Sequence, residues 1–435
     1  MPLPDLPDQV PAQWHEAKAA PSPDLRSWWR TFHDPVLDGL VEHALADNLN
    51  LAQALARIEA ARHLVGASEL GHDPQIGFHT YAEPTPDSSA SYFQFGFDAK
   101  WEFGWFGRAE SEQRMAAGDL QLAAAEAQAA RVSVVAEVVR SYLELRAAQQ
   151  RASLLDRLAA GARQRHELDA LRLRLRLGTP TELVRSEAEL AQAQAALSEP
   201  HAALVRSRRQ LAVLLGRHEL DEVLLPPGEV PRLGASGIAQ APADLLRTRP
   251  EIRRAEAQVL RSAGELGLAQ ADRLPRLGLG GGLTYAARVI GHTRLSEAAG
   301  IVTFGPAIDI PLFDWGMRQH VADARAAQLQ ASLHAYRQAV LEGVAEAETA
   351  LATLEQQRLR EQALGQAVVA LEGEARAAAT RRRLGLADER ERLEADAALL
   401  QARLQALAAR QDRGIALVAL YKALGGAPLP AGTAQ

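Results

Sequence analysis

The stretch Ser91–Arg108, SYFQFGFDAKWEFGWFGR, determines how the rest of the chain is organised. From Phe93 to Trp101 every second residue is apolar, whereas the residues between them are polar or very small. A period of two is typical of a β-strand with one apolar and one polar face. Because the apolar positions are rich in aromatic residues, the pattern is also typical of a tilted membrane-spanning strand. A long helical stretch rich in Ala, Gln, Glu and Arg follows directly, from about residue 109 to 176.

The composition of the 435-residue chain favours long packed helices over compact globules, because aromatic residues are few and alanine is abundant. The net charge of -6 gives no basis for nucleic-acid binding. No window reaches 18 uncharged apolar residues, so we expect no transmembrane helix. The sequence contains no cysteine, which excludes disulfides, thiolate metal sites and a lipid-anchoring cysteine in it. The first residues, MPLPDLPDQVP, lack the basic and apolar regions of a signal peptide, so we expect a secretion signal to be absent or already removed.

Two tandem copies of one pattern follow each other along the chain: helix, β-hairpin, long helix, shorter helix. A shift of 201 residues places Leu51 on Ile252, Pro74 on Pro275 and Ile76 on Leu277. The turn LFDWGMR at 312–318 repeats EFGWFGR at 102–108, and Gly385 corresponds to Gly178 where the long helices end. We therefore expect an N-terminal segment 1–34, a first repeat 35–216 with a hairpin at 75–103, a linker 217–243, a second repeat 244–425 with a hairpin at 276–312, and a tail 426–435.

The expected element lengths constrain the architecture. The first helix runs from Pro35 to about Leu70, and each long helix holds about 65 to 70 residues, roughly 100 Å. Each shorter helix holds about 35 residues, so two stacked end to end match one long helix. Leucines at heptad spacing predict a coiled-coil seam, and Pro200 predicts a kink near Ser198.

Four strands per chain are too few to close a membrane barrel, and an open sheet edge is not stable in lipid. Closure therefore needs several chains, and two would supply eight strands whereas three would supply about twelve.

Six segments of the sequence carry a recognisable pattern: Phe32–Pro35, Asn48–Arg62, Trp101–Arg108, Asp244–Glu256, Pro311–Gly316 and Leu420–Gly426. On these residues the chain resembles a known family, the outer membrane factors of bacterial efflux and type I secretion systems, which include TolC- and OprM-like proteins. The match covers nearly the whole chain and is most similar to the pump-associated, NodT-type lipoprotein branch. That branch often carries an acylated N-terminal cysteine where this chain has Met1, so a lipid anchor is not supported.

The resemblance implies a mainly α-helical fold with membrane β-structure: a homotrimer whose twelve-stranded β-barrel lies in the outer membrane of a Gram-negative bacterium. A long α-helical barrel would continue it across the periplasm. The implied function is that of a passive exit duct, contacting outer-membrane lipid, a periplasmic adaptor and an inner-membrane pump. The alternatives are a type I secretion duct, a soluble coiled-coil scaffold and a periplasmic adaptor. The resemblance leaves the substrate open, and multidrug resistance is one of the possible roles.

The turns between long and short helices are the expected periplasmic tips. By resemblance to the family's tip motif, the expected adaptor contacts are Leu177, Gly178, Thr179, Leu384, Gly385 and Leu386. A simpler interpretation makes both glycines ordinary helix C-caps with positive φ, and both interpretations can hold together.

Acidic residues six and nine positions after the second tip glycine constrict the pore in relatives, and here they are Glu391 and Glu394. Arg390 and Arg392 would pair with them and hold the mouth shut. The alternative is an exposed helix with pairs between residues three or four apart.

The alternating strands supply the expected lipid-facing side chains, although a soluble sheet would also bury them. These residues are Phe93, Phe95, Phe97, Trp101, Leu277, Leu279 and Phe304. We find no catalytic motif or nucleophile arrangement in the sequence and expect no enzymatic activity, no cofactor and no metal site.

Overall fold

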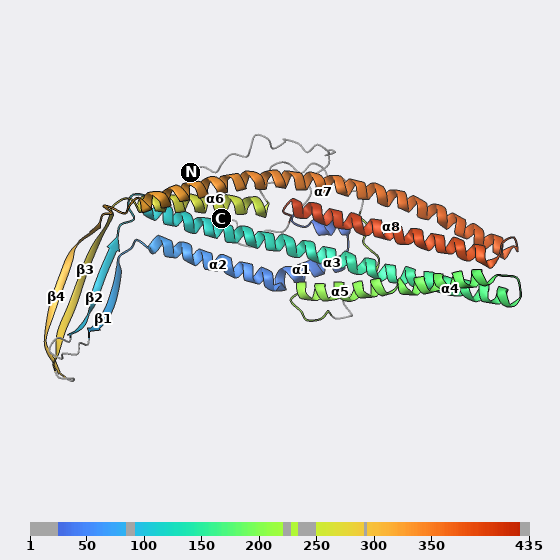
Figure 1. Cartoon of the computed structure of the whole chain (residues 1–435), viewed down its shortest axis with the longest axis horizontal. Helices are drawn as coiled ribbons and strands as arrows, with labels where there is room; N and C mark the ends of the chain where they lie inside the picture. The colour runs from blue at the N-terminus through green and yellow to red at the C-terminus, as the bar shows by residue number, and fades with distance from the viewer. Residues whose placement is uncertain (1–24, 84–91, 221–227, 234–248, 291–293, 427–435) are drawn as a thin grey trace. The chain divides into compact units, whose positions relative to one another are not determined.

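A computed structural model describes residues 25–83, 92–220, 228–233, 249–290 and 294–426 of the chain (Figure 1). Over these residues the fold is mainly α-helical and contains one β-sheet. The chain divides into two compact units. The described part of unit 1 comprises residues 55–83, 92–125, 253–290 and 294–339, and that of unit 2 comprises 25–54, 126–220, 228–233, 249–252 and 340–426. In this part of the chain, no helix is both long and apolar enough to cross a membrane.

Both halves of the chain share the order helix, two strands, long helix, shorter helical segment, and the first half also has η1 and α1 before it and a shorter segment divided into two helices (Figure 1). The first half contains the 3-10 helix η1 (Trp28–Phe32), α1 (Pro35–Asp47), α2 (Leu49–Leu70), β1 (Gln75–Glu83), β2 (Tyr92–Glu102), α3 (Arg108–Arg174), α4 (Pro180–Ala195) and α5 (Ser198–Leu214). The second half contains α6 (Pro250–Ala271), β3 (Arg276–Ile290), β4 (Arg294–Asp309), α7 (Met317–Arg383) and α8 (Glu389–Ala423).

The two long helices are equal in length, since α3 and α7 each contain 67 residues. Both begin after a pair of residues with positive φ, Phe106–Gly107 before α3 and Trp315–Gly316 before α7. These pairs correspond at an offset of 209 residues (Arg108 to Met317), whereas the starts of β1 and β3 correspond at 201 (Gln75 to Arg276). The second hairpin is therefore longer than the first by eight residues, which explains why the offset drifts in the sequence.

The single sheet of unit 1 has the order β1-β2-β3-β4 and is antiparallel throughout. Within the described chain β1 and β4 are its edges, because each pairs with only one neighbour. The central pair β2–β3 joins the hairpin of the first half to the hairpin of the second half. The two hairpins thus form one continuous four-stranded surface.

The hydrophobic core of unit 2 packs η1 and α1 against α3, α5 and α8. The ring of Trp28 stacks on that of Tyr421 at 4.8 Å between centroids, and its Nε1 donates to the carbonyl oxygen of Gly426. The Tyr142 hydroxyl donates to Asp34, whose other carboxylate oxygen caps the start of α1. Trp28, Trp29 and Phe32 of the N-terminal segment are all buried here.

Three element boundaries differ from the sequence-based prediction. The helix expected from Pro35 to Leu70 is interrupted at Asn48, whose side chain caps the next helix by accepting from the Leu51 N–H and donates to the carbonyl oxygen of Leu214. The expected kink near Ser198 is a full break between α4 and α5 at residues 196–197, whereas α8 is continuous. The last strand ends at Asp309 instead of Leu312, so Ile310 and Leu312 follow the sheet.

Candidate functional site

The sheet of unit 1 has one apolar and one polar face. Residues that pair directly across antiparallel strands share a face, and the register pairs Phe97 with both Phe78 and Leu283. The same face continues across all four strands through Ile76, Phe95, Ala99, Trp101, Leu277, Leu279, Tyr285, Val302, Phe304, Pro306 and Ile308. The opposite face is mostly polar or small, with Gly77, His79, Gln94, Gly96, Asp98, Lys100, Glu102, Gly278, Gly280, Gly282, Thr284, Thr303 and Gly305, and it also carries the apolar residues Tyr81, Ile301 and Ala307.

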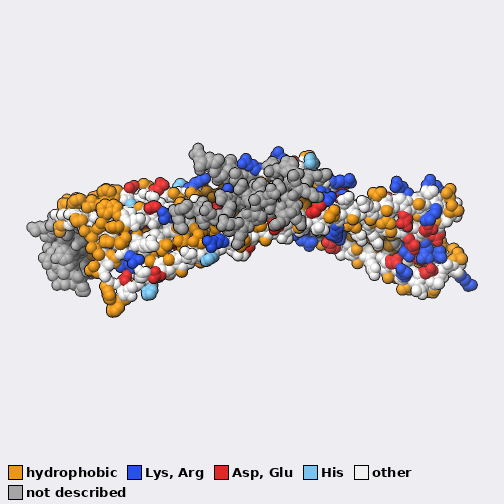
Figure 2. Space-filling view, turned by 90° about the horizontal axis from the view of Figure 1, so that it is seen from above, with side chains coloured by type: hydrophobic (Ala, Val, Ile, Leu, Met, Phe, Trp, Pro, Cys, Tyr) orange, Lys and Arg blue, Asp and Glu red, His pale blue; other side chains and the backbone are white. Residues whose placement is uncertain are grey.

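The apolar face is exposed in the single chain. Phe304 is 81% exposed and Phe97 54% exposed, although most apolar side chains of that size are buried in a folded soluble protein. Ring contacts join neighbouring strands, with Phe78 against Phe97 and Phe95 stacked on Tyr285. The left-hand part of Figure 2 shows hydrophobic side chains gathered in the region of the sheet. A surface of this kind requires an apolar environment, and a lipid bilayer supplies one.

The predicted strand residues lie where the alternation places them. Phe95, Phe97, Trp101, Leu277, Leu279 and Phe304 share the apolar face, while the side chain of Phe93 lies outside the described residues. A chain of ring contacts continues from Trp101 through Phe103 to Trp105 where the sheet meets α3, and Phe313 contacts Trp315 before α7. Aromatic side chains of this kind are typical of the boundary between membrane and water.

The helical tips are the two turns of unit 2 that join α3 to α4 and α7 to α8. Their backbones have the same hydrogen-bond pattern: Leu177 N–H donates to the Arg172 carbonyl, and Leu386 N–H donates to the Arg381 carbonyl. Thr179 caps α4 with a capping box that includes Glu182, and the side chain of Asp388 caps α8. The turns therefore correspond residue by residue at the offset of 209.

This correspondence corrects the expected equivalence of the two tip glycines. Gly385 has φ +73° and ends its helix in the left-handed conformation, but its counterpart is Arg176, at φ 61°, and not Gly178. Gly178 lies outside the left-handed region. Glycine is favoured there for lack of space, because an added Cβ would lie 3.2 Å from the Arg172 Cβ. The glycine C-cap interpretation therefore holds for Gly385 only.

The tip residues proposed from sequence are largely exposed. Leu177, Leu384 and Leu386 are exposed, and Leu175, which sequence analysis missed, is the counterpart of Leu384; the four leucines are between 60 and 73% exposed. Thr179 is exposed but its hydroxyl accepts from the Glu182 N–H, so part of its role is structural. Each turn thus presents two leucines to solvent.

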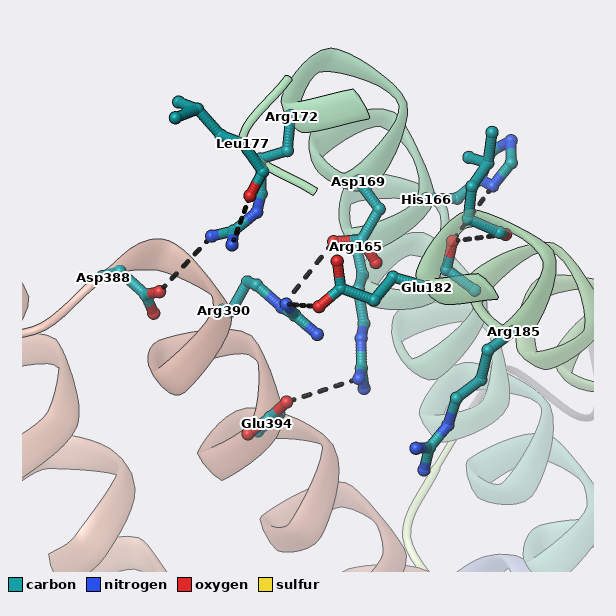
Figure 3. Close-up of polar contacts among 12 residues, drawn as sticks. Arg165, His166, Asp169, Arg172, Leu177, Glu182, Arg185, Asp388, Arg390 and Glu394 are labelled. Carbon is teal, nitrogen blue, oxygen red and sulfur yellow. Dashed lines mark hydrogen bonds and ion pairs between the residues drawn. The ribbon is translucent and has the colours of Figure 1, made fainter. Parts of the chain in front are cut away.

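Ion pairs join the α3–α4 hairpin to α8 just behind the tips (Figure 3). Arg390 of α8 lies 3.6 Å from Asp169 of α3 and donates to Glu182 of α4 at 3.0 Å. Arg165 of α3 lies 3.3 Å from Glu394 of α8. Figure 3 shows these side chains converging from the two hairpins, with Asp388 facing Arg172 at the outer end.

The expected partners of the acidic pair are wrong within this chain. Glu391 pairs with Arg381 of α7, and Glu394 pairs with Arg165, whereas Arg390 pairs with Asp169 and Glu182. Arg392 pairs along its own helix with Glu389 and Asp396, as the simpler interpretation expects. The sequence contains no local signal for the long-range pairs, because Asp169 and Arg390 lie in different repeats.

The tip combines a buried charge with lowered carboxyl pKa values. The Asp169 side chain is only 2% exposed, and neither of its oxygens has a hydrogen bond within the described chain. The backbone N–H of Thr179, and then Arg390, lower the pKa of Glu182. A hydrogen bond from Arg392 lowers the pKa of Glu389, and a hydrogen bond to Glu182 raises the pKa of Arg390. Glu182, Glu389 and Arg390 therefore stay charged at neutral pH.

The sequence profile that describes outer membrane efflux proteins matches residues 40–217 and 241–426, far more than half of the chain. The chain belongs to the outer membrane efflux protein family. Among its relatives, nodulation protein T of Rhizobium leguminosarum bv. trifolii is 25% identical over 371 residues, covering 81% of this chain and 78% of that protein. The pyoverdine export outer membrane protein OpmQ of Pseudomonas aeruginosa is 27% identical over 456 residues, covering 96% and 91%. A solved structure of the outer-membrane channel OprN is 29% identical, with a TM-score of 0.81 over 98% of this chain and 99% of that one.

These comparisons confirm the family, the outer-membrane location and the efflux function inferred from sequence. The apolar face of the sheet is the part of this efflux protein whose chemistry suits the membrane. The helical tips lie in the other unit, and their charged contacts give this efflux protein its second candidate site.

Proposed function

We propose that three copies of this efflux protein form an exit duct, with a twelve-stranded barrel in the outer membrane continued by an α-helical barrel in the periplasm. The observation that supports it is the sheet, which has an apolar face and two edges, β1 and β4, without a partner in the described chain. In lipid every backbone group must be paired, so these edges need another chain. An even number of strands lets β1 of one copy continue the antiparallel order after β4 of the next.

The trimer can be tested by crosslinking, because the sequence contains no cysteine that would interfere. A variant with Thr80→Cys in β1 and Val302→Cys in β4 is treated in the membrane with bis-maleimides of increasing length. We expect covalent products up to three chains and none larger. The control carries Phe95→Cys and Tyr285→Cys, which lie opposite each other in the register of β2 and β3 and should link only within one chain. Products limited to two chains, or products that extend without limit, would refute the trimer.

We also assign the helical tips to docking and gating. A periplasmic adaptor held by an inner-membrane pump would contact Leu177, Gly178, Thr179, Leu384, Gly385 and Leu386. Exposed leucines on both turns support this contact, because apolar side chains gain free energy when a partner covers them. Glu391, Glu394 and Arg390 would constrict the pore, and adaptor binding would shift the population towards an open tip. Substrate would then leave passively, driven by the pump, and no catalytic step is assigned to this chain.

A further inference from the structure

Arg176 has a backbone conformation that its side chain disfavours. It lies at the end of α3 with φ 61°, where its counterpart in the second turn is Gly385 with φ +73°. Residues with a Cβ pay about 1 kcal/mol or more for the left-handed conformation, and glycine does not. The fold alone would therefore favour glycine at position 176.

Nothing in the described chain uses the Arg176 side chain. It is exposed and forms no ion pair or hydrogen bond with another described residue. The neighbouring Arg172, by contrast, donates to the Leu177 carbonyl and faces Asp388. Arginines in a last helical turn commonly interact with the helix dipole, but Arg176 lies beyond the last residue of α3. An exposed cation held at an energetic cost indicates a role outside the chain.

The acidic groups near the tip are already paired within the chain. Asp388 faces Arg172, Glu389 pairs with Arg382 and Arg392, and Glu391 pairs with Arg381. Arg174 is exposed without an ion pair among the described residues, and Arg383 donates only to Thr380. The two corresponding segments are Arg174–Leu177, RLRL, and Arg383–Leu386, RLGL. The outermost surface is therefore apolar and cationic, and its complement is an apolar surface with carboxylates.

From these observations we infer that Arg176 recognises a carboxylate on the adaptor surface that covers Leu175 and Leu177, and that it makes the two tips of one chain unequal for docking. This inference rests on the proposed function, in which an adaptor binds the tips. Arginine suits the role because its guanidinium pairs with a carboxylate through two parallel hydrogen bonds. The second tip has the corresponding leucines, Leu384 and Leu386, but Gly385 in place of the arginine. An adaptor with an acidic contact residue would therefore prefer the first tip.

The test measures binding of the full-length protein in nanodiscs to each periplasmic adaptor of the host bacterium, purified without its membrane anchor. We expect Arg176→Gly to weaken binding about tenfold while thermal stability stays equal or rises, because the substitution relieves the backbone conformation. Arg176→Glu should weaken binding further, and Arg176→Lys should retain most of it. The matched control is Arg185→Gln on α4 of the same hairpin, whose guanidinium already pairs with Glu189 at 3.1 Å and which should bind like the parent.

The outcomes separate the inference from the proposed function. An adaptor that binds the parent and Arg176→Gly equally would overturn the role of Arg176 and leave docking at the tips intact. If binding falls with Arg176→Gly, replacing single adaptor carboxylates by arginine in the presence of Arg176→Glu should restore it, and failure of every such replacement would also overturn the inference. If no adaptor binds the parent, or if Leu177→Ser with Leu386→Ser leaves binding unchanged, docking at the tips fails and the inference fails with it.

Discussion

Arg390 is the residue whose loss should most strongly loosen the contact between the hairpins at the tips. Its guanidinium is the one charged partner of the buried Asp169 carboxylate in the described chain, and it also holds Glu182. Arg390→Gln would leave the Asp169 charge buried and unpaired. Breaking a buried ion pair in this way costs about 3–5 kcal/mol. Because the Arg390 side chain is 21% exposed and water can approach it, we expect the lower end, about 3 kcal/mol.

The opposite substitution should have a smaller effect. Asp169→Asn removes the buried charge and leaves Arg390 bound to Glu182 at 3.0 Å, so we expect a cost of about 1 kcal/mol or less. The double variant should lie close to Asp169→Asn, because no unpaired buried carboxylate remains. The matched control is Arg392→Gln, two residues further along α8, whose ion pairs both lie within that helix and contribute about 0.5 kcal/mol each.

Urea unfolding measures the loss of stability, and single-channel conductance in planar bilayers measures the loosening of the contact between the hairpins. A loss of about 3 kcal/mol corresponds to about a hundredfold change in an equilibrium constant. If the closed tip depends on this contact, Arg390→Gln should raise the fraction of time spent in high-conductance states far more than Arg392→Gln. The Asp169–Arg390 pair is not the main contact at the tips if Arg390→Gln and Arg392→Gln unfold and conduct alike, or if Asp169→Asn lowers the stability more than Arg390→Gln.

Four further outcomes can be checked. Phe304→Arg should lower the stability of the membrane-inserted protein by about 2–4 kcal/mol if it lies near the bilayer midplane, whereas Thr303→Arg on the polar face should be tolerated; folding into lipid vesicles measures both. Replacing Glu391 and Glu394 by Ala should raise single-channel conductance and lower cation selectivity, and unchanged current would remove them from the gate. The pKa values of Glu182 and Glu389 are lowered in the folded chain, so their ionised carboxylates stabilise the fold fully at neutral pH. This stabilisation is lost as the pH falls through the lowered pKa values. Hydrogen exchange at the tips should therefore accelerate on the acid side of the usual glutamate range. Gly385→Ala should cost about 1 kcal/mol in urea unfolding because of its positive φ, whereas the same substitution at Gly178 depends only on crowding against Arg172 and Glu182.

The architecture was largely predictable because periodicity follows directly from the repeating geometry of strands and helices. The alternation from Phe93 to Trp101 corresponds to β2, and the helix start predicted at Pro35 is the start of α1. The break at Asn48 was not predictable from periodicity, because the apolar pattern continues across it. The Asn48 side chain explains the interruption, since it caps the next helix at the Leu51 N–H and donates to the Leu214 carbonyl oxygen. Equating Gly178 with Gly385 failed for a similar reason: identity of residue type suggested a match, whereas the hydrogen bonds of the two turns pair Gly385 with Arg176.

The ion pairs at the tips could not be predicted from the sequence, because pairs between repeats depend on helix rotation, which periodicity does not fix to one residue.

The contacts at the tips differ in kind from the ones that hold the sheet together. The strands are joined by ladders of backbone hydrogen bonds, which in lipid cannot be exchanged for water and therefore stay closed. The hairpins at the tips meet through side-chain charges, several of them partly exposed, which water and salt can replace at modest cost. If the tips change between a closed and an open state, as proposed, the buried Asp169–Arg390 pair would supply the larger share of the free energy that opposes opening. Salt acts chiefly on the partly exposed pairs Arg165–Glu394 and Arg172–Asp388, which remain when Arg390 is replaced. We therefore expect added salt to accelerate hydrogen exchange at the tips of the parent and of Arg390→Gln alike.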